Sequence, residues 1–335
     1  MAKQIDEIVA IWNAITDNES HPPGWKVLPL TSDGSLRFLG GRLFPGSLES
    51  LLVQLPSRIT ISQHELPTAR GFEVAITDPY QQGDKWISIS RSKNGNADLF
   101  RTMIQDLLER LENQNKADPS KLASSLLIHI KMWQLFMSKA ENHMGPEREL
   151  GLFGELIVFE FLGEAVLAED LLIGHWLGPE NSPQDFVLSN GAIEVKTTSA
   201  GSPTLVKISS ISQLDDSFIS PIYMCFQRIK HSSTGRTLPE LIEDITLKLK
   251  DPFSRELFND KLLSAGYHSS NASRFNNRYS LTHREYYEIR DNFPRITSLQ
   301  LTQAVSNVKY DLDLSYAYEF EVSESIVVRH LKGTE

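Results

Sequence analysis

Two acidic residues and a lysine stand close together in the segment DFVLSNGAIEVKTT, residues 185–198. The Asn-Gly pair at 190–191 predicts a two-residue hairpin turn, because both central positions of a type I′ turn adopt positive φ angles. That turn would place Asp185 opposite Lys196, and residues two apart on a strand project from the same face of a sheet. We therefore expect Asp185, Glu194 and Lys196 on one face, at the open end of the hairpin.

These residue types suit metal-assisted cleavage of a phosphodiester. Magnesium prefers oxygen ligands and typically binds one or two carboxylates together with water and phosphate oxygens. Such an ion can activate a water molecule and neutralise charge in the transition state. A neighbouring lysine can orient that water or stabilise the developing negative charge. The opposite face of the hairpin is apolar and can pack into a core, since it carries Phe186, Leu188, Ile193 and Val195.

A solvated ion pair is the alternative explanation for Glu194 and Lys196. About one Glu-x-Lys is expected by chance at this composition, and residues 194–196 are the sole Asp/Glu-x-Lys in the chain. An acid at Asp185 on the same face favours a metal site, because two crowded carboxylates repel each other unless a cation joins them.

A further acid lies in a segment that is apolar nearly all round, GLFGELIVFEFLGE, residues 151–164. Such a pattern is typical of a buried helix. Its apolar stripe contains Leu152, Leu156 and Phe159 at helical spacing, and Glu155 falls within that stripe. A lone buried carboxylate is costly unless it is paired or binds a metal. The alternative is a glutamate that bonds to the backbone or to an arginine.

The elements that must position these residues form an α/β pattern. Residues 25–92 are β-rich, and we expect helices at about 97–113, from 119 to about 142, over 150–162, at about 238–249 and near 254–265. Further strands are expected in TLVKISS, IYMCFQRIK, RYSLTH, ITSLQL and VKYDLDLSY. The expected division is a β-rich region ending in a helix (1–117), a core with the acids (118–230) and an α/β extension (231–335).

Composition excludes several classes of protein. A net charge of −10 over 335 residues argues against nonspecific coating of nucleic acid, although acids elsewhere can mask a local basic cleft. No apolar run approaches the ~20 residues of a membrane helix, and the N-terminus lacks the pattern of a signal peptide, so we expect a cytoplasmic protein. The single cysteine, Cys225, rules out an intrachain disulfide. Neither a zinc-ligand spacing of histidines nor a P-loop occurs.

Taken together, the acids and the lysine resemble the PD-(D/E)XK nuclease superfamily, the fold of many restriction endonucleases. That family carries a helical Glu, then a hairpin with an Asp and an (Asp/Glu)-x-Lys. Glu155 matches the helical acid and Asp185 the first hairpin acid, while residues 194–196 match the second motif. The resemblance implies a restriction-endonuclease-like core, with a central four-stranded mixed sheet flanked by helices. It also implies magnesium-dependent cleavage of DNA, for which manganese can substitute.

A wider stretch is similar to an uncharacterised bacterial group of PD-(D/E)XK motif proteins. Its shared segments correspond here to residues 151–156, 176–179, 185–186, 193–198 and 207–214. Such proteins are similar to components of phage-defence and restriction gene clusters. In that group the last segment leads from a strand into a helix, which makes Gln213 a candidate supporting residue. Gln184, rather than Pro, precedes Asp185 here.

Arginines and tyrosines are interspersed in RFNNRYSLTHREYYEIRDNFPR, residues 274–295. Arginine suits phosphates and base edges, and aromatic rings can stack on bases. Arg274, Arg278 and Arg284 are therefore candidate DNA contacts. The alternative is an edge strand or helix with a solvated charged face.

The resulting hypothesis is a DNA endonuclease of restriction or antiviral defence. The resemblance implies that Glu155, Asp185 and Glu194 bind magnesium and that Lys196 assists the attacking water, so that all four are catalytic. The expected partners are DNA and proteins of a defence system. The oligomeric state stays open, although a dimer would suit double-strand cleavage. Two alternatives stay open: a noncatalytic nucleic-acid-binding or scaffold subunit that keeps the nuclease fold, and a hydrolase of RNA or small nucleotides.

Overall fold

The computed structural model describes residues 2–15, 23–30, 36–56, 61–62, 66–67, 71–113, 118–140, 144–180, 182–199, 201 and 204–334. The chain divides into two compact units, Met1–Asn142 and His143–Glu335. These units differ from the expected division at 117/118 and 230/231, because residues 118–140 belong to the first unit and residues 231–335 share a unit with the acids. Within the described ranges, no helix is both long and apolar enough to span a lipid bilayer.

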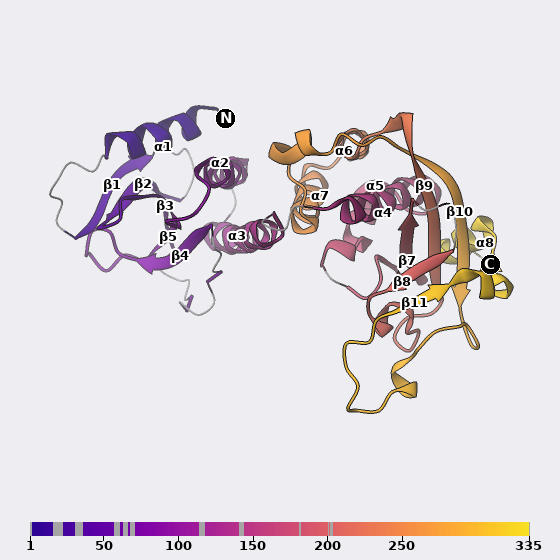
Figure 1. Cartoon of the computed structure of the whole chain (residues 1–335). Helices are drawn as coiled ribbons and strands as arrows, with labels where there is room; N and C mark the ends of the chain where they lie inside the picture. Colours follow the sequence, from indigo (N-terminus) through magenta and orange to yellow (C-terminus); the bar gives the residue numbers. More distant parts are fainter. Residues whose placement is uncertain are drawn as a thin grey trace. The chain divides into compact units, whose positions relative to one another are not determined.

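The first unit contains a five-stranded antiparallel sheet in the order β1-β2-β3-β5-β4, together with three helices (Figure 1). Its elements are α1 (Ala2–Ala14), β1 (Gly24–Leu30), β2 (Phe38–Phe44), β3 (Leu48–Gln54), β4 (Phe72–Thr77), β5 (Trp86–Arg91), α2 (Ala97–Asn113) and α3 (Pro119–Ala140). The β-rich region and α2 agree with the sequence prediction, whereas α1 was not foreseen. α1 approaches β2 closely at Gly40, where a Cβ atom would lie 2.9 Å from Ile11 Cγ2.

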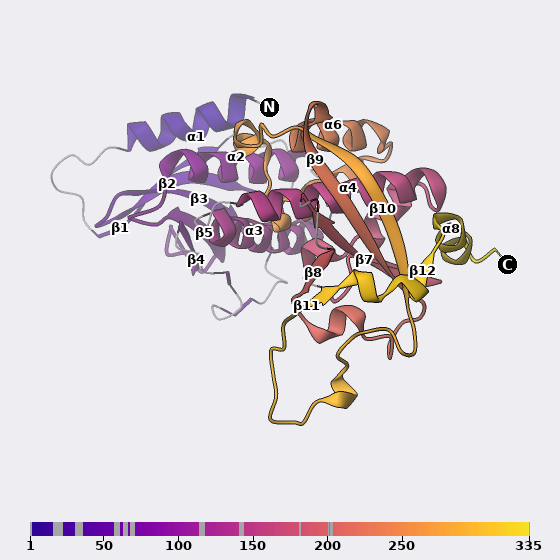
Figure 2. The same cartoon turned by 45° about the vertical axis from the view of Figure 1, so that its right-hand side comes forward.

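The second unit is built on a mixed sheet in the order β12-β10-β9-β7-β6, in which β7 and β9 run parallel and the other neighbours antiparallel (Figure 2). Its strands are β6 (Phe186–Leu188), β7 (Gly191–Thr198), β8 (Leu205–Ile208), β9 (Ile222–Arg236), β10 (Tyr279–Ile289), β11 (Tyr310–Asp313) and β12 (Glu321–Val322). Its helices are α4 (Pro146–Ala165), α5 (Glu169–Leu172), α6 (Leu238–Lys248), α7 (Pro252–Ala265) and α8 (Glu324–Lys332). The expected α/β class with a mixed sheet is therefore confirmed, with five strands in place of four.

This sheet separates two apolar cores. One core joins α4, α6 and α7 to the sheet and includes the four predicted hairpin residues Phe186, Leu188, Ile193 and Val195. The other core joins Ala192 of β7 and residues of β9 to the paired strands β8 and β11. α4 packs in the first core and the β8–β11 pair in the second, so they cover opposite faces of the sheet. The hairpin is thus fixed from both faces.

The β6–β7 hairpin pairs differently from the prediction. Leu188 pairs with Gly191, so the two residues between them form the turn. The predicted turn at 190–191, with Asp185 opposite Lys196, is therefore wrong, and the observed register brings Asp185 level with Glu194. The shift along β7 is two residues, and side chains alternate with a period of two. The acids consequently stay on the face that the sequence predicted.

The neighbouring strand segment explains why a glycine stands at position 191. A Cβ atom on Gly191 would lie 2.8 Å from the Pro221 carbonyl oxygen, and the residue adopts a φ of +149°. The next residue, Ala192, donates its N–H to that same carbonyl oxygen at 2.9 Å. Gly191 is therefore needed both for the turn and to let the segment before β9 lie close to β7.

The predicted strand ITSLQL, residues 296–301, is not a strand. It contains a short 3-10 helix, Ser298–Gln300, and Leu299 is largely exposed. Apolar alternation alone did not decide the outcome, since strand formation depends on a partner strand and a surface to pack against. The following segment does form a strand as predicted, β11, and its Leu312 is buried.

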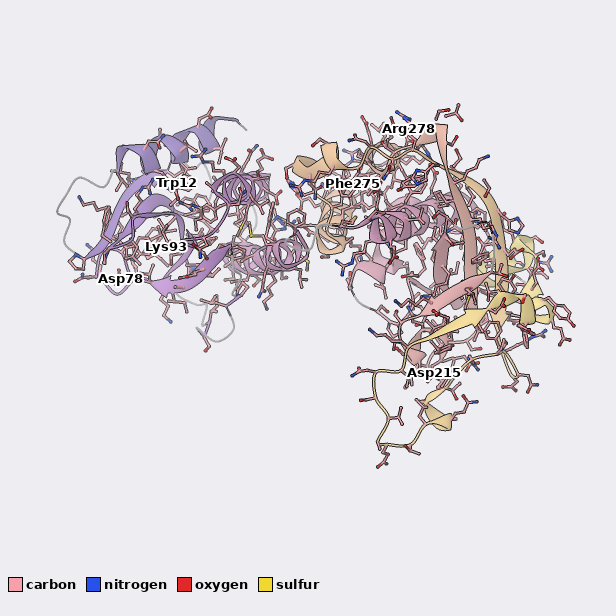
Figure 3. The ribbon with its side chains drawn as sticks, in the orientation of Figure 1. Trp12, Asp78, Lys93, Asp215, Phe275 and Arg278 are labelled. Carbon is pink, nitrogen blue, oxygen red and sulfur yellow. The ribbon has the colours of Figure 1, made fainter. Side chains whose placement is uncertain are left out.

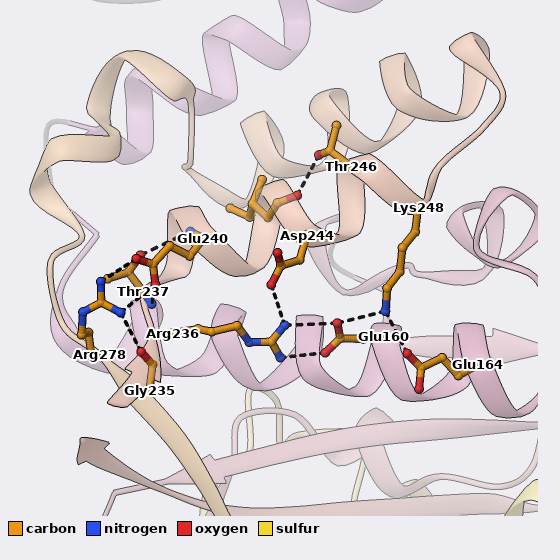
Figure 4. A network of polar contacts seen from close by, with 11 residues as sticks. Glu160, Glu164, Gly235, Arg236, Thr237, Glu240, Asp244, Thr246, Lys248 and Arg278 are labelled. Carbon is orange, nitrogen blue, oxygen red and sulfur yellow. Dashed lines mark hydrogen bonds and ion pairs between the residues drawn. The ribbon is translucent and has the colours of Figure 1, made fainter. Parts of the chain in front are cut away.

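A network of charges fastens α4 to β9 and α6 (Figure 4). Arg236 donates to both carboxylate oxygens of Glu160, at 3.1 and 2.7 Å, and also to Asp244 at 2.9 Å. Lys248 bridges Glu160 at 3.1 Å and Glu164 at 2.8 Å. The hydrogen bond from Arg236 is the main reason that the pKa of Glu160 lies below its ordinary value. Glu160 therefore anchors the helix that carries Glu155.

Replacing Glu160 with Gln should destabilise the second unit by about 1–2 kcal/mol at pH 7, because charge-assisted hydrogen bonds are lost and the partners are partly screened by solvent. A lowered pKa means that this stabilisation is present above about pH 4.3 and is lost as the pH falls through the folded-state pKa. Urea unfolding of wild type and Glu160→Gln at pH 7 and pH 3 measures the difference. It should shrink at pH 3, and an equal difference at both pH values would contradict the pairing. Glu164→Gln is the control, since that side chain is 65% exposed and an exposed pair contributes little.

Candidate active site

Close packing of α4 against β7 brings Glu155 to the sheet. A Cβ atom on Gly154 would overlap Thr197 Oγ1, so only a glycine permits this approach. Gln227 of β9 also donates to the Gly154 carbonyl oxygen at 3.0 Å, which fixes the helix from the neighbouring strand. The Glu155 carboxylate accepts a hydrogen bond at Oε2 from Trp176 Nε1 at 2.8 Å. Its partner is thus a tryptophan, neither the backbone nor an arginine.

Asp185 lies beside Glu155 at the start of the hairpin. Its Oδ2 accepts the N–H of Val195 at 2.7 Å, which holds the side chain against β7. A Cβ atom on Gly178 would lie 2.5 Å from Glu155 Oε2 and 2.7 Å from Asp185 Oδ1. Because one point lies that near to both oxygens, the two carboxylates can be no more than about 5.2 Å apart there. The structure therefore brings the helical acid and the hairpin acid together.

Glu194, Lys196 and Gln213 form a connected group on the same face. Glu194 Oε1 accepts from Lys196 Nζ and from Gln213 Nε2, each at 2.7 Å. Lys196 also donates to Gln213 Oε1 at 3.2 Å. Gln213 reaches the strand from a short 3-10 helix, Ile211–Leu214, which follows β8. The candidate supporting residue from the sequence thus contacts both members of the Glu-x-Lys motif.

Gln184 is a residue that sequence reasoning passed over as a departure from the motif. Its side chain is buried, and Nε2 donates to the carbonyl oxygens of Ser212 at 2.9 Å and Gln213 at 3.3 Å. A proline at this position could not make these bonds. The hydrogen-bonding side chain next to Asp185 was the available signal, although its partners lie almost thirty residues away in sequence.

Burial raises the pKa of all three acids. For Glu194, burial is the largest cause and the charge of Asp185 adds to it, so that its pKa is about 8 in spite of Lys196. Burial likewise raises the pKa of Asp185 to about 6, against the opposing effects of the Val195 N–H and Lys196. The pKa of Glu155 is raised well above its ordinary value by burial and by the charge of Asp185, while the bond from Trp176 opposes the shift. A nearby cation would relieve the cost that these shifts reflect.

One oxygen of the site, on Glu194, lacks a partner and suits a divalent cation. Glu194 Oε2 is buried without a hydrogen bond, and oxygen ligands of this kind suit magnesium. Among the described residues, no group of three or more His, Cys, Asp or Glu side chains is placed to hold a metal ion. Magnesium does not need three, because it can bind through one or two carboxylates and complete its shell with water and phosphate.

The three candidate DNA contacts are not gathered at this group. Arg278 donates to Glu240 at 2.6 and 2.9 Å and lies at the opposite end of the second unit from Asp215, which follows Gln213 by two residues (Figure 3). Arg284 is mostly buried, with its guanidinium 4.8 Å from the ring centre of Phe161 on α4. The exposed Arg274 ends a 3-10 helix before β10. Contact with DNA by these arginines stays a prediction.

Comparison with known proteins gives one family. Residues 8–315 match the model of the family described as "Putative PD-(D/E)XK family member, (DUF4420)", and the match covers most of both units. No curated protein and no solved structure matches the chain. The family description agrees with the resemblance that the acids and the lysine suggested from sequence.

The raised pKa values predict that the metal-free second unit loses stability as the pH rises. A carboxyl with a raised folded-state pKa holds its proton in the native state where the unfolded chain has released it, so stability falls from about pH 4 to pH 8. Thermal unfolding in a chelator across this range should show the fall, and Glu194→Gln should make it smaller. An identical fall in Glu194→Gln would contradict the assigned burial of this charge, and Glu164→Gln serves as the control.

Proposed function

This chain belongs to the PD-(D/E)XK family, and we propose that it is a magnesium-dependent nuclease that hydrolyses phosphodiester bonds in DNA. The observation that carries the proposal is the buried Glu194 carboxylate, with one oxygen bonded to Lys196 and Gln213 and the other without a partner. The carboxylates of Glu155 and Asp185 lie beside each other in the same site. Charges in this arrangement suit a cation and a phosphate better than they suit a stable ion pair.

Glu155, Asp185 and Glu194 would hold the cation. Because no three such side chains of the described residues are yet placed to hold an ion together, binding by all three would require their side chains to move closer. A bound magnesium ion supplies an activated water and neutralises charge on the phosphate, and manganese can substitute for it. The existing hydrogen bonds of Asp185 and Glu194 indicate which carboxylate oxygen of each would face the cation. Asp185 keeps Oδ1 available because its Oδ2 is occupied by the Val195 N–H. Glu194 presents Oε2 because Lys196 and Gln213 occupy Oε1.

Lys196 is placed to contact the phosphate or the attacking water. An ammonium group has three donors, and the two bonds to Glu194 and Gln213 leave one for a substrate oxygen. The side-chain amide of Gln213 helps to hold Lys196 in place: its oxygen accepts from Lys196, and its nitrogen donates to Glu194, the other partner of the lysine. These contacts support a charge-stabilising role for Lys196. We assign the activity to restriction or phage defence, as the sequence resemblance suggests.

Cleavage of supercoiled, linear and single-stranded DNA, and of RNA, with magnesium or manganese tests the proposal. Asp185→Ala and Lys196→Ala should each slow cleavage by about 100-fold or more, because an acid ligand or a charge-stabilising donor is lost. Lys332→Ala is the control, since this exposed lysine of α8 takes no part in the network that holds α4 and should retain activity.

Cleavage that survives in both site variants would overturn the assignment. Cleavage of RNA alone would keep the site and correct the substrate. If wild type cuts none of these substrates, magnesium binding that Asp185→Ala abolishes would favour an activity that needs a partner protein, whereas unchanged binding would favour the noncatalytic alternative.

A further inference from the structure

Lys261 of α7 is a buried lysine outside the motif residues. Its side chain is only 4% exposed. The ammonium group donates to the Trp176 carbonyl oxygen at 2.6 Å and to the Glu180 carboxylate. Taking an ammonium group out of water is costly unless its donors are satisfied. Both partners of Lys261 belong to one short loop, residues 176–180.

That loop contacts two of the three acids of the site, Glu155 and Asp185. Its first residue, Trp176, donates Nε1–H to Glu155 Oε2 at 2.8 Å. The N–H groups of Leu177 and Gly178 both donate to the Asp185 carbonyl oxygen, at 2.7 and 3.1 Å. The loop therefore holds the side chain of one acid and the backbone of the other, and any movement of it displaces both.

α7 holds Trp176 at two points. The indole ring is fully buried, with its centre 5.9 Å from that of Phe258 on α7 and 6.0 Å from that of Phe159 on α4. Phe258 and Lys261 lie three residues apart, so they project from the same side of α7. Ring packing fixes the plane of the indole, and the bond from Lys261 fixes its backbone. Together they determine where Nε1–H points.

We propose that Lys261 is a positioning residue that keeps the 176–180 loop against Glu155 and Asp185, so that both carboxylates are set for a divalent cation. This inference rests on the proposed function only in taking these acids as metal ligands. Lys261 would act through another residue, since its ammonium group donates to Trp176 and Glu180 and not to an acid of the site. Partners that orient metal ligands typically affect metal affinity by about 10- to 100-fold when they are removed.

Calorimetric titration of the full-length chain with Mn²⁺ measures the expected effect. Lys261→Met and Trp176→Phe should each weaken Mn²⁺ binding by about 10-fold. If Lys261 acts through Trp176, the double variant should be no weaker than the weaker single variant, because residues in one chain of contacts are not additive. Lys332→Met is the control: it removes an exposed lysine of α8, outside the network that holds α4, and should leave the affinity unchanged.

Hydrogen exchange of the metal-free protein gives a second reading. The Leu177 and Gly178 amides should exchange faster in Lys261→Met, since the loop loses its anchor, while amides of β9 should not change. Lys261→Gln keeps a donor at the end of a shorter side chain, and it should show smaller changes of the same kind. It also replaces Lys261→Met as the test variant if the latter does not fold.

Unchanged Mn²⁺ affinity in Lys261→Met and Lys261→Gln would overturn the positioning role, even where Asp185→Ala abolishes binding and the nuclease proposal stands. Additive losses in the double variant would overturn the route through Trp176. A chain that binds Mn²⁺ in a Lys261-dependent way and cuts no nucleic acid would keep this inference, while nuclease activity of the chain without a partner protein would be ruled out. Absence of Mn²⁺ binding in wild type would overturn both.

Discussion

The contact between α4 and β7 at Gly154 is the constraint on which the site depends. The acids come from a helix and from a hairpin, and they meet only because the helix backbone can approach Thr197 without an intervening side chain. Gln227 and the network around Glu160 hold the helix in this position from β9 and α6. Packing thus determines the geometry of groups whose own charges oppose their being together.

The fold tolerates the buried acids of the site because neighbouring groups donate hydrogen bonds to them. Two apolar cores enclose the sheet on both faces, and this burial raises the pKa values of the acids. Each acid has one oxygen held by a donor: Trp176 for Glu155, the Val195 N–H for Asp185, and Lys196 with Gln213 for Glu194. A cation would complete a group of carboxylates that the protein has already oriented in part.

Much of this arrangement could be predicted from local sequence patterns, because those patterns report which face a residue occupies. The turn of the hairpin was placed one position too late on each strand, yet the acids remained on one face since faces repeat every two residues. The apolar stripe likewise identified Glu155 as a residue that needed a partner. The identity of that partner, Trp176, depends on a loop without any periodicity, and no local rule could supply it.

Long-range contacts and context-dependent segments were the parts that sequence could not supply. Lys261 lies more than eighty residues from its loop partners, and in sequence it is one charged residue on a helix that shows no distinct motif. The segment 296–301 has the apolar content of a strand, but whether a neighbouring strand is available to it depends on the whole fold.

The parallel pairing of β7 and β9 also affects the order in which the acids can come together. Asp185 and Glu194 are nine residues apart and belong to a local hairpin, whereas parallel strands and the docking of α4 require long loops to close. A metal ion present while the chain folds would therefore meet the hairpin acids first and Glu155 only afterwards.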